Sequence, residues 1–118
     1  MKVITDYEFS FKDERGILRQ LISSQHGFKQ INWATSKKGV SRGGHFHKIV
    51  TETFYLIKGR VKVHIKNMKT HEEQNKVFEI GDIFIIEPYD KHTVEALEDS
   101  EWVAFFNEQI NNGDIYKE

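Results

Sequence analysis

Residues 39–59, which read GVSRGGHFHKIVTETFYLIKG, are the most informative stretch of the chain. It carries two histidines one residue apart, His45 and His47, followed by Glu52. Residues i and i+2 of a strand point to the same face, so the two imidazoles converge on one spot. A carboxylate that follows across a short bend can return to that spot. These three side chains have the spacing of a metal site, and His92 is a candidate fourth ligand.

The composition is typical of a small globular protein. The chain has 118 residues, of which 38% are hydrophobic and 13% aromatic, and it contains no Cys. A chain of this length buries about 65% of its unfolded surface, enough for one core without disulfides. We therefore predict a single domain over residues 1–118.

The charge and hydropathy patterns exclude several function classes. A formal net charge of -1 gives no basis for binding nucleic acid or an anionic membrane. The first residues are polar, and no apolar run approaches the roughly 18 residues that span a bilayer. We predict a cytoplasmic protein that does not associate with membranes.

Short β-type runs separated by turn signals predict an all-β sandwich or barrel. In residues 60–66, Val61, Val63 and Ile65 alternate with polar residues and predict one buried face. The polar run 70–74 is predicted to be a loop, and residues 109–118 to fray or exchange between protomers. The predicted strands are 16–22, 28–34, 42–47, 52–58, 60–66, 76–79, 82–87, 92–97 and 101–107.

The spacing G-x5-H-x-H-x4-E-x6-G in residues 39–59 resembles the first sequence motif of the cupin superfamily. Residues 81–92, GDIFIIEPYDKH, resemble the second motif, which ends in a histidine, although Pro88 sits one place late. The resemblance implies a cupin double-stranded β-helix, or jelly-roll, barrel in which His92 faces the first two histidines.

Three imidazoles and one carboxylate suit a divalent metal and leave coordination positions open for substrate or water. We predict such a site at His45, His47, Glu52 and His92, with Zn as the first choice and Fe, Mn or Ni as alternatives. The competing interpretation is that each residue is an ordinary hydrogen-bonded or surface side chain. The remaining histidines are expected at the surface: His26, His64 and His71.

Residues 13–18, 27–32 and 36–45 are similar to the sugar-nucleotide branch of the cupins. This branch includes the dTDP-4-dehydrorhamnose 3,5-epimerases, the 3,4-ketoisomerases and the C-terminal cupin domain of capsular-polysaccharide reductases. The resemblance implies that Arg15 and Arg42 contact a nucleotide diphosphate, which suits the guanidinium fork.

One predicted strand carries two further candidates. Gln30 and Asn32 share one face of residues 28–34, where they could bind a sugar. Ile31 and Trp33 take the other face, with core or dimer packing as the expected role.

The positions at which this sequence differs from the family motifs narrow the choice among these activities. The metal-free 3,5-epimerases carry Gln and Lys at the positions of His47 and Glu52, and Phe105 stands near their catalytic tyrosine. A standard metal-free epimerase is therefore disfavoured, and the metal-type capsular domain is closer. The ketoisomerases share the run from Arg42 to Lys48 but use its histidines as acid and base.

The lead hypothesis is an isomerase that moves a proton next to the 4-keto group of a dTDP- or UDP-linked deoxysugar in polysaccharide biosynthesis. Without a metal, His45 is the expected base and His47 its partner; with a metal, the base comes from elsewhere, such as Tyr89 or Asp90. The alternatives are an Fe(II)-dependent cupin oxygenase and a non-catalytic sugar- or effector-binding cupin. We also expect a homodimer, because small cupins expose strand edges that pairing would cover.

Overall fold

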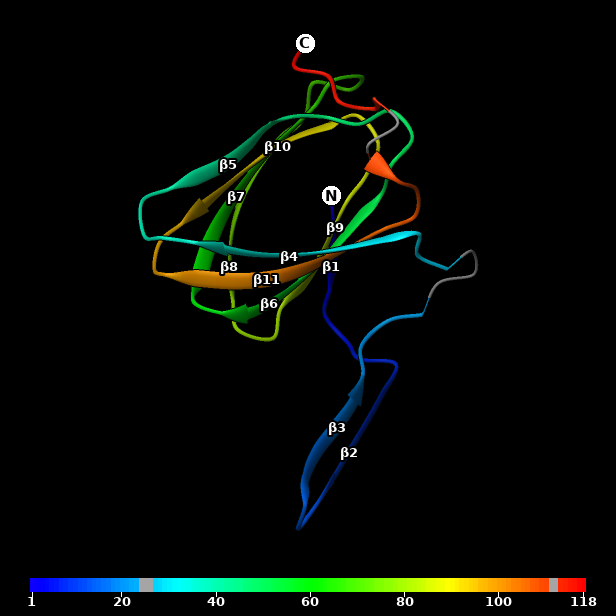
Figure 1. The fold of residues 1–118 in the computed structure, drawn as a ribbon, viewed down its shortest axis with the longest axis vertical. Helices are drawn as coiled ribbons and strands as arrows, with labels where there is room; N and C mark the ends of the chain where they lie inside the picture. The colour runs from blue at the N-terminus through cyan, green and yellow to red at the C-terminus, as the bar shows by residue number, and fades with distance from the viewer. Residues whose placement is uncertain (24–26, 111–112) are drawn as a thin grey trace.

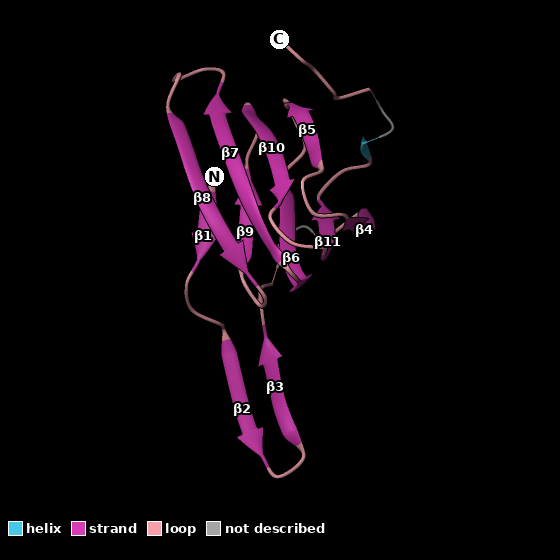
Figure 2. Cartoon of the chain, turned by 90° about the vertical axis from the view of Figure 1, so that its left-hand side faces the viewer, coloured by secondary structure: helices cyan, strands magenta, loops and turns pink. Residues whose placement is uncertain are grey.

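A computed structural model describes residues 1–23, 27–110 and 113–118 of the chain. Two sheets face each other as a barrel, and a hairpin of two strands projects away from it (Figures 1 and 2). In the described ranges, no helix combines the length and the apolar character that crossing a membrane requires.

The described residues form eleven strands, numbered in chain order. The first six are β1 (Lys2–Ile4), β2 (Phe9–Asp13), β3 (Gly16–Gln20), β4 (Gln30–Ser36), β5 (Ser41–His45) and β6 (Glu52–Lys58). The next five are β7 (Arg60–Asn67), β8 (Glu73–Glu79), β9 (Ile83–Ile86), β10 (Asp90–Ala96) and β11 (Ser100–Phe106). One sheet has the order β1-β9-β6-β11-β4, the second the order β5-β10-β7-β8, and β2 and β3 form a separate pair.

The core lies between the two large sheets. Val61, Val63 and Ile65 of β7 are buried, as their alternation predicts. Across from them, the ring of Phe84 stacks between Phe54 at 4.8 Å and Phe78 at 4.2 Å, measured between ring centroids. These three rings belong to the apolar core between the sheets.

The predicted all-β class is confirmed, and each predicted strand has a counterpart. Two short N-terminal strands, β1 and β2, were not predicted. The prediction of a loop at 70–74 is wrong at its end, because β8 already begins at Glu73. Strand β8 pairs with β7 at the edge of its sheet and exposes most of its side chains, so a polar sequence is compatible with a strand there.

The turn between β6 and β7 depends on Gly59, whose φ is +86°. A Cβ at this position would lie 2.3 Å from the Ser100 Oγ. The left-handed backbone and the close approach of the neighbouring strand therefore both require glycine. This corner sends β6 and β7 into different sheets.

Candidate metal centre and adjoining pocket

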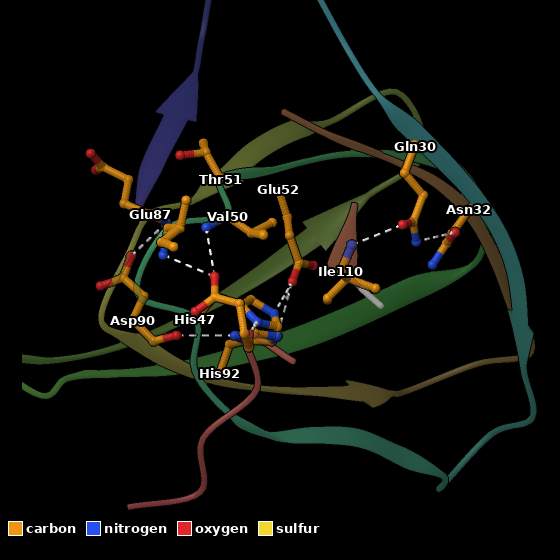
Figure 3. Close-up of polar contacts among 12 residues, drawn as sticks. Gln30, Asn32, His47, Val50, Thr51, Glu52, Glu87, Asp90, His92 and Ile110 are labelled. Atoms are coloured by element: carbon orange, nitrogen blue, oxygen red, sulfur yellow. Dashed lines mark hydrogen bonds and ion pairs between the residues drawn. The ribbon is translucent and has the colours of Figure 1, made fainter. Parts of the chain in front are cut away.

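The four residues with ligand-type spacing come together in the structure. His45 ends β5 and lies opposite His92 of β10, His47 follows in the next loop, and Glu52 begins β6. One candidate ligand atom from each of the four lies within 4.8 Å of the others. Figure 3 shows His47, Glu52 and His92 turned toward one another. Strand register and a short loop thus place all four on one spot.

The close approach of β5 to β10 depends on Gly43. Its φ is +108°, and a Cβ there would lie 2.4 Å from the carbonyl oxygen of His92. The pairing between the two strands is irregular at this point, between His92 and Thr93. Only a residue without a side chain lets β5 come so close, and this contact sets the position of His45 against His92.

Two backbone carbonyls fix the orientation of two imidazoles. The Nδ1–H of His47 donates to the Asp114 carbonyl at 2.5 Å, and the Nδ1–H of His92 donates to the Asp90 carbonyl at 3.0 Å. A carbonyl can only accept, so Nδ1 carries a proton in both rings. The Nε2 atoms then face Glu52 Oε1, at 2.5 Å for His47 and 3.7 Å for His92.

The Nε2 of His47 has an unusual environment. It is buried and, among the described residues, makes no hydrogen bond, because the nearby Glu52 oxygen does not have hydrogen-bond geometry toward it. Buried polar atoms are nearly always satisfied, so an orphaned atom needs an explanation. An imidazole nitrogen that shares its spot with two further imidazoles and a carboxylate belongs to the donor set of a divalent-cation site.

The electrostatics of the metal-free cluster differ between its members. Burial, together with the neighbouring His92 and His47, lowers the pKa of His45 to about 4. Burial also lowers the pKa of His92. Burial acts on His47 in the same sense, but the carboxylate of Glu52 and the contacts with Asp114 outweigh it and raise its pKa. His45 and His92 are therefore neutral near pH 7, the protonation state in which imidazole binds metals.

A cavity of about 230 Å³ adjoins the cluster. Its polar side includes His45, Glu52 and His92, and its other side is an apolar wall. The wall residues are Ala34, Phe54, Val94, Trp102, Ala104, Phe106 and Ile110. A larger cavity of about 350 Å³ lies elsewhere, beside Met1 and Asn67, and none of the four candidate ligands lines it. Of these two cavities, the smaller one is therefore the candidate substrate pocket, because candidate metal ligands line it.

Two of the four predicted substrate-binding residues line this pocket, namely Asn32 and Arg42. The Arg42 Nη2 donates to the Thr35 carbonyl at 2.9 Å, which steadies its side chain at the rim. Gln30 shares the face of Asn32, as predicted, and donates to its Oδ1 at 3.0 Å (Figure 3). Its own oxygen accepts from the Ile110 N–H at 3.0 Å, so Gln30 supports a wall residue instead of lining the cavity.

The structure does not bring Arg15 or Tyr89 to the pocket, within the part of the chain that it describes. Arg15 lies at the tip of the β2–β3 hairpin, where its exposed guanidinium pairs with Asp13 at 2.7 Å. The Tyr89 ring stacks on Phe46, and the Lys69 Nζ lies 4.2 Å from its centroid. The predicted roles of Arg15 and Tyr89 thus lack support from their placement.

The other predictions have mixed outcomes. The core role expected for Ile31 and Trp33 is wrong, since their side chains are 63% and 64% exposed on the outer face of β4, while dimer packing stays a prediction. His64 and His71 lie outside the cluster, as predicted. His26 falls outside the described residues.

Sequence reasoning missed Asp114 and the apolar wall. Residues 109–118 were expected to fray or exchange, yet Asp114 is only 7% exposed and Tyr116 pairs with Phe46. No local signal marks an aspartate in a polar tail as buried, because its partners lie more than 60 residues earlier in the chain.

The chain matches the family described as Polysaccharide biosynthesis C-terminal domain over residues 11–114. It is also 34% identical over 58 residues to a UDP-2-acetamido-2,6-beta-L-arabino-hexul-4-ose reductase of Pseudomonas aeruginosa. The matched stretch is 49% of this chain but 15% of the reductase, so the chain corresponds to a small part of that relative.

Several solved structures have the same fold. QdtA, a sugar 3,4-ketoisomerase of Thermoanaerobacterium thermosaccharolyticum solved with TDP, has a TM-score of 0.75 at 18% identity and covers 95% of this chain and 85% of its own. The dTDP-4-dehydrorhamnose 3,5-epimerase of Sulfolobus tokodaii has a TM-score of 0.72 at 22% identity, with 85% and 66% covered. The capsular polysaccharide assembling protein CapF of Staphylococcus aureus has a TM-score of 0.68 at 21% identity, with 92% and 33% covered. The jelly-roll fold is thereby confirmed, and the structures that share it include an epimerase and a ketoisomerase of the kinds named in the resemblance.

Proposed function

We propose that this chain, which belongs to the Polysaccharide biosynthesis C-terminal domain family, is a metal-binding isomerase of nucleotide sugars. In this proposal it moves a proton next to the 4-keto group of a dTDP- or UDP-linked deoxysugar. Neighbours with this fold are named as an epimerase and a ketoisomerase of such sugars, which supports the reaction class.

One observation carries the proposal. The orphaned Nε2 of His47 converges with His45, His92 and Glu52 on a single spot, and that spot adjoins a cavity with an apolar far wall. These four residues would hold a divalent cation, with Zn as the first choice and Fe, Mn or Ni as alternatives. When bound, such a cation supplies positive charge that stabilises an enolate oxygen.

The pocket residues would bind and orient the substrate. A cavity of about 230 Å³ is below the roughly 300–1,000 Å³ of pockets for drug-sized ligands, so it suits the sugar and leaves the nucleotide outside. The guanidinium of Arg42 at the rim can pair with a diphosphate, and the amide of Asn32 can bind a sugar hydroxyl. The wall formed by Phe54 and Trp102 excludes water and accepts the carbon that lacks a hydroxyl.

His45 is the candidate base of the metal-free form. It is the most exposed of the four cluster residues and lines the pocket. Its lowered pKa leaves it unprotonated near pH 7, which a base requires, but also makes it a weaker base than an ordinary imidazole. Tyr89 and Asp90 are weaker candidates, because neither lines this cavity and the Asp90 carboxylate already accepts a hydrogen bond from Asn67. A cation that bound His45 as a ligand would remove this base. The metal content of the protein therefore decides between the metal-bound mechanism and the metal-free mechanism with His45 as base.

Two measurements test the proposal together. Elemental analysis of protein purified without an affinity metal is expected to find about one Zn per chain. Incubation with dTDP-4-keto-6-deoxyglucose in D2O, followed by NMR, is expected to show deuterium at C3 or C5. Calorimetric binding of the nucleotide sugar without any exchange would instead identify a non-catalytic sugar-binding cupin. Iron together with substrate-dependent O2 uptake would identify an oxygenase.

We also propose a homodimer. The β2–β3 hairpin carries an apolar face made of Phe9, Phe11 and Leu18, which are 48%, 48% and 65% exposed. Strand β4 adds the exposed Trp33 at the edge of its sheet. Contiguous exposed apolar surface and free strand edges are features of contact surfaces, and a second copy of the chain would cover them. Light scattering that finds a monomer at micromolar concentration contradicts the dimer.

A further inference from the structure

A short segment near the C-terminus returns to the loop that carries His47. We call residues 114–116 the C-terminal strap. The Phe46 N–H donates to the Tyr116 carbonyl at 2.8 Å, and the Tyr116 N–H donates back to the Phe46 carbonyl at 3.0 Å. The Tyr116 ring also packs on Phe46, and the Lys48 Nζ lies 4.1 Å from its centroid. The strap is thus held on both sides of His47.

The carboxylate of Asp114 holds the loop that follows His47. Its Oδ1 accepts from the Lys48 N–H at 2.8 Å, and its Oδ2 accepts from the N–H groups of Ile49 and Val50, each at 2.9 Å. Asp114 is 7% exposed, so water competes little for these bonds. Three successive N–H groups bound to one carboxylate fix the path of the chain from His47 toward Glu52.

The main chain of the same residue holds the ring of His47. The Asp114 carbonyl accepts from Nδ1–H, which selects the tautomer with a lone pair on Nε2 and turns that atom into the cluster. Side chain and carbonyl therefore act together, because the three bonds to the loop put the carbonyl where the imidazole needs it.

We propose that Asp114 is the positioning residue for His47, and that it sets the tautomer and direction of this one candidate ligand. The inference deepens the proposed function and rests on it where it concerns metal affinity. His92 offers an internal contrast, since its Nδ1 bonds to the carbonyl of Asp90 only two residues away. The orientation of His92 is local, whereas that of His47 depends on a residue 67 positions later.

The first test measures Zn2+ affinity by competition with a chromophoric chelator. Asp114→Ala is expected to weaken binding about 10–100-fold, the usual cost of removing a group that orients a metal ligand. Asp114→Asn keeps one oxygen for Ile49 and Val50 but turns an NH2 group toward Lys48, so we expect a smaller loss. Asp82→Ala is the matched control: Asp82 also accepts from a backbone N–H, that of Glu79, but lies outside the cluster. This control is expected to leave Zn2+ affinity within about twofold of the wild type.

The second test does not need metal. Long-range ¹H–¹⁵N NMR of the imidazoles in metal-free protein, recorded at a pH high enough for His47 to be neutral, is expected to show His47 as the single Nδ1–H tautomer in the wild type and in Asp82→Ala. Asp114→Ala is expected to show His47 as a tautomer mixture, with His92 unchanged. A merely structural role for Asp114 would instead disturb both rings or neither.

The outcomes separate the two ideas. A wild type that binds no Zn2+ contradicts the proposed function, and the tautomer of His47 then still decides the role of Asp114. Wild-type Zn2+ binding that Asp114→Ala leaves unchanged, or a His47 tautomer that the variant does not alter, overturns the inference. If Asp114→Ala does not fold, Asp114→Asn supplies both readouts, with the same directions expected.

Discussion

The wall of the barrel around the candidate ligands and the β2–β3 hairpin are both built from short alternating strands, yet they differ in how their side chains are held. Around the cluster, His47, Glu52 and His92 are each at most 3% exposed, and their positions depend on strand register, Gly43 and Asp114. The hairpin strands pair with each other and present Phe9, Phe11 and Leu18 to solvent.

The two regions therefore differ in whether a single chain supplies all the contacts that their side chains need. All four candidate ligands of the cluster come from one chain, and backbone carbonyls orient two of them, His47 and His92. Within the described residues, the core does not cover the apolar face of the hairpin, so we expect a second molecule to cover it. Changes in the first region should affect metal binding, whereas changes in the second should leave metal binding intact and affect association.

The largest expected effect comes from Glu52→Gln, which keeps the shape of the side chain but removes its charge from the cluster. We expect Zn2+ affinity to fall at least about 100-fold, since even groups behind the ligands are worth 10–100-fold. Solvent deuterium exchange into the substrate should be lost as well. Arg15→Ala at the hairpin tip should leave Zn2+ affinity unchanged. Equal metal content in wild type and Glu52→Gln contradicts the assignment of the site.

Two glycines give the second comparison. Gly43→Ala places a Cβ 2.4 Å from the His92 carbonyl oxygen at a φ of +108°, so we expect a loss of about 4 kcal/mol from overpacking and backbone strain together. Gly16→Ala in the hairpin has a φ of +133° but no atom within 4 Å of the new Cβ, so about 1–2 kcal/mol from strain alone is expected. Urea unfolding of both variants measures the difference. Similar losses would show that the β5–β10 approach is not as close as described.

Metal removal is expected to affect the two regions differently. At a free Zn2+ concentration of 100 times Kd, binding to the folded state adds about 2.7 kcal/mol, or roughly 10 °C in Tm for a chain of this size. Calorimetry before and after treatment with EDTA, and again after Zn2+ is restored, measures this shift. Hydrogen exchange should slow in β5 and β10 on metal binding and stay unchanged in β2 and β3. A Tm that does not respond to Zn2+ argues against a site within the barrel.

The sequence alone groups His45, His47 and Glu52, because their spacing is local. His92 lies far along the chain in β10, and only the resemblance to the second cupin motif implied its place in the cluster. The alternation in β7 is also local, and it predicts the buried face of that strand. Strand β6 is predicted with its observed bounds, and Gly59 marks its C-terminal end.

What the sequence leaves open depends on contacts between distant segments. Asp114 looks like any polar residue of a tail, and its partners at 48–50 are set by the path of the chain. Arg15 matches a family motif, but its hairpin projects away from the barrel (Figure 1), and Arg15 does not line the pocket. Trp33 was assigned by alternation to a packed face, and alternation cannot tell whether that face meets the core, a partner or solvent.

The smallest expected effect on the barrel comes from the hairpin face, through Leu18→Asp. The wild type should scatter light as a dimer, and the variant as a monomer at micromolar concentration, because a charge would be buried in the apolar contact. Ile17→Asp is the matched control, since Ile17 is also exposed but lies on the opposite face of the hairpin. Zn2+ affinity should be unchanged in both variants. The unfolding free energy of the full-length monomer should stay within about 0.5 kcal/mol of the wild type. If the two variants dissociate the dimer equally, the contact does not use the face of Phe9, Phe11 and Leu18. If Leu18→Asp also weakens Zn2+ binding, the hairpin of one copy reaches the cluster of the other, and the two regions are not independent.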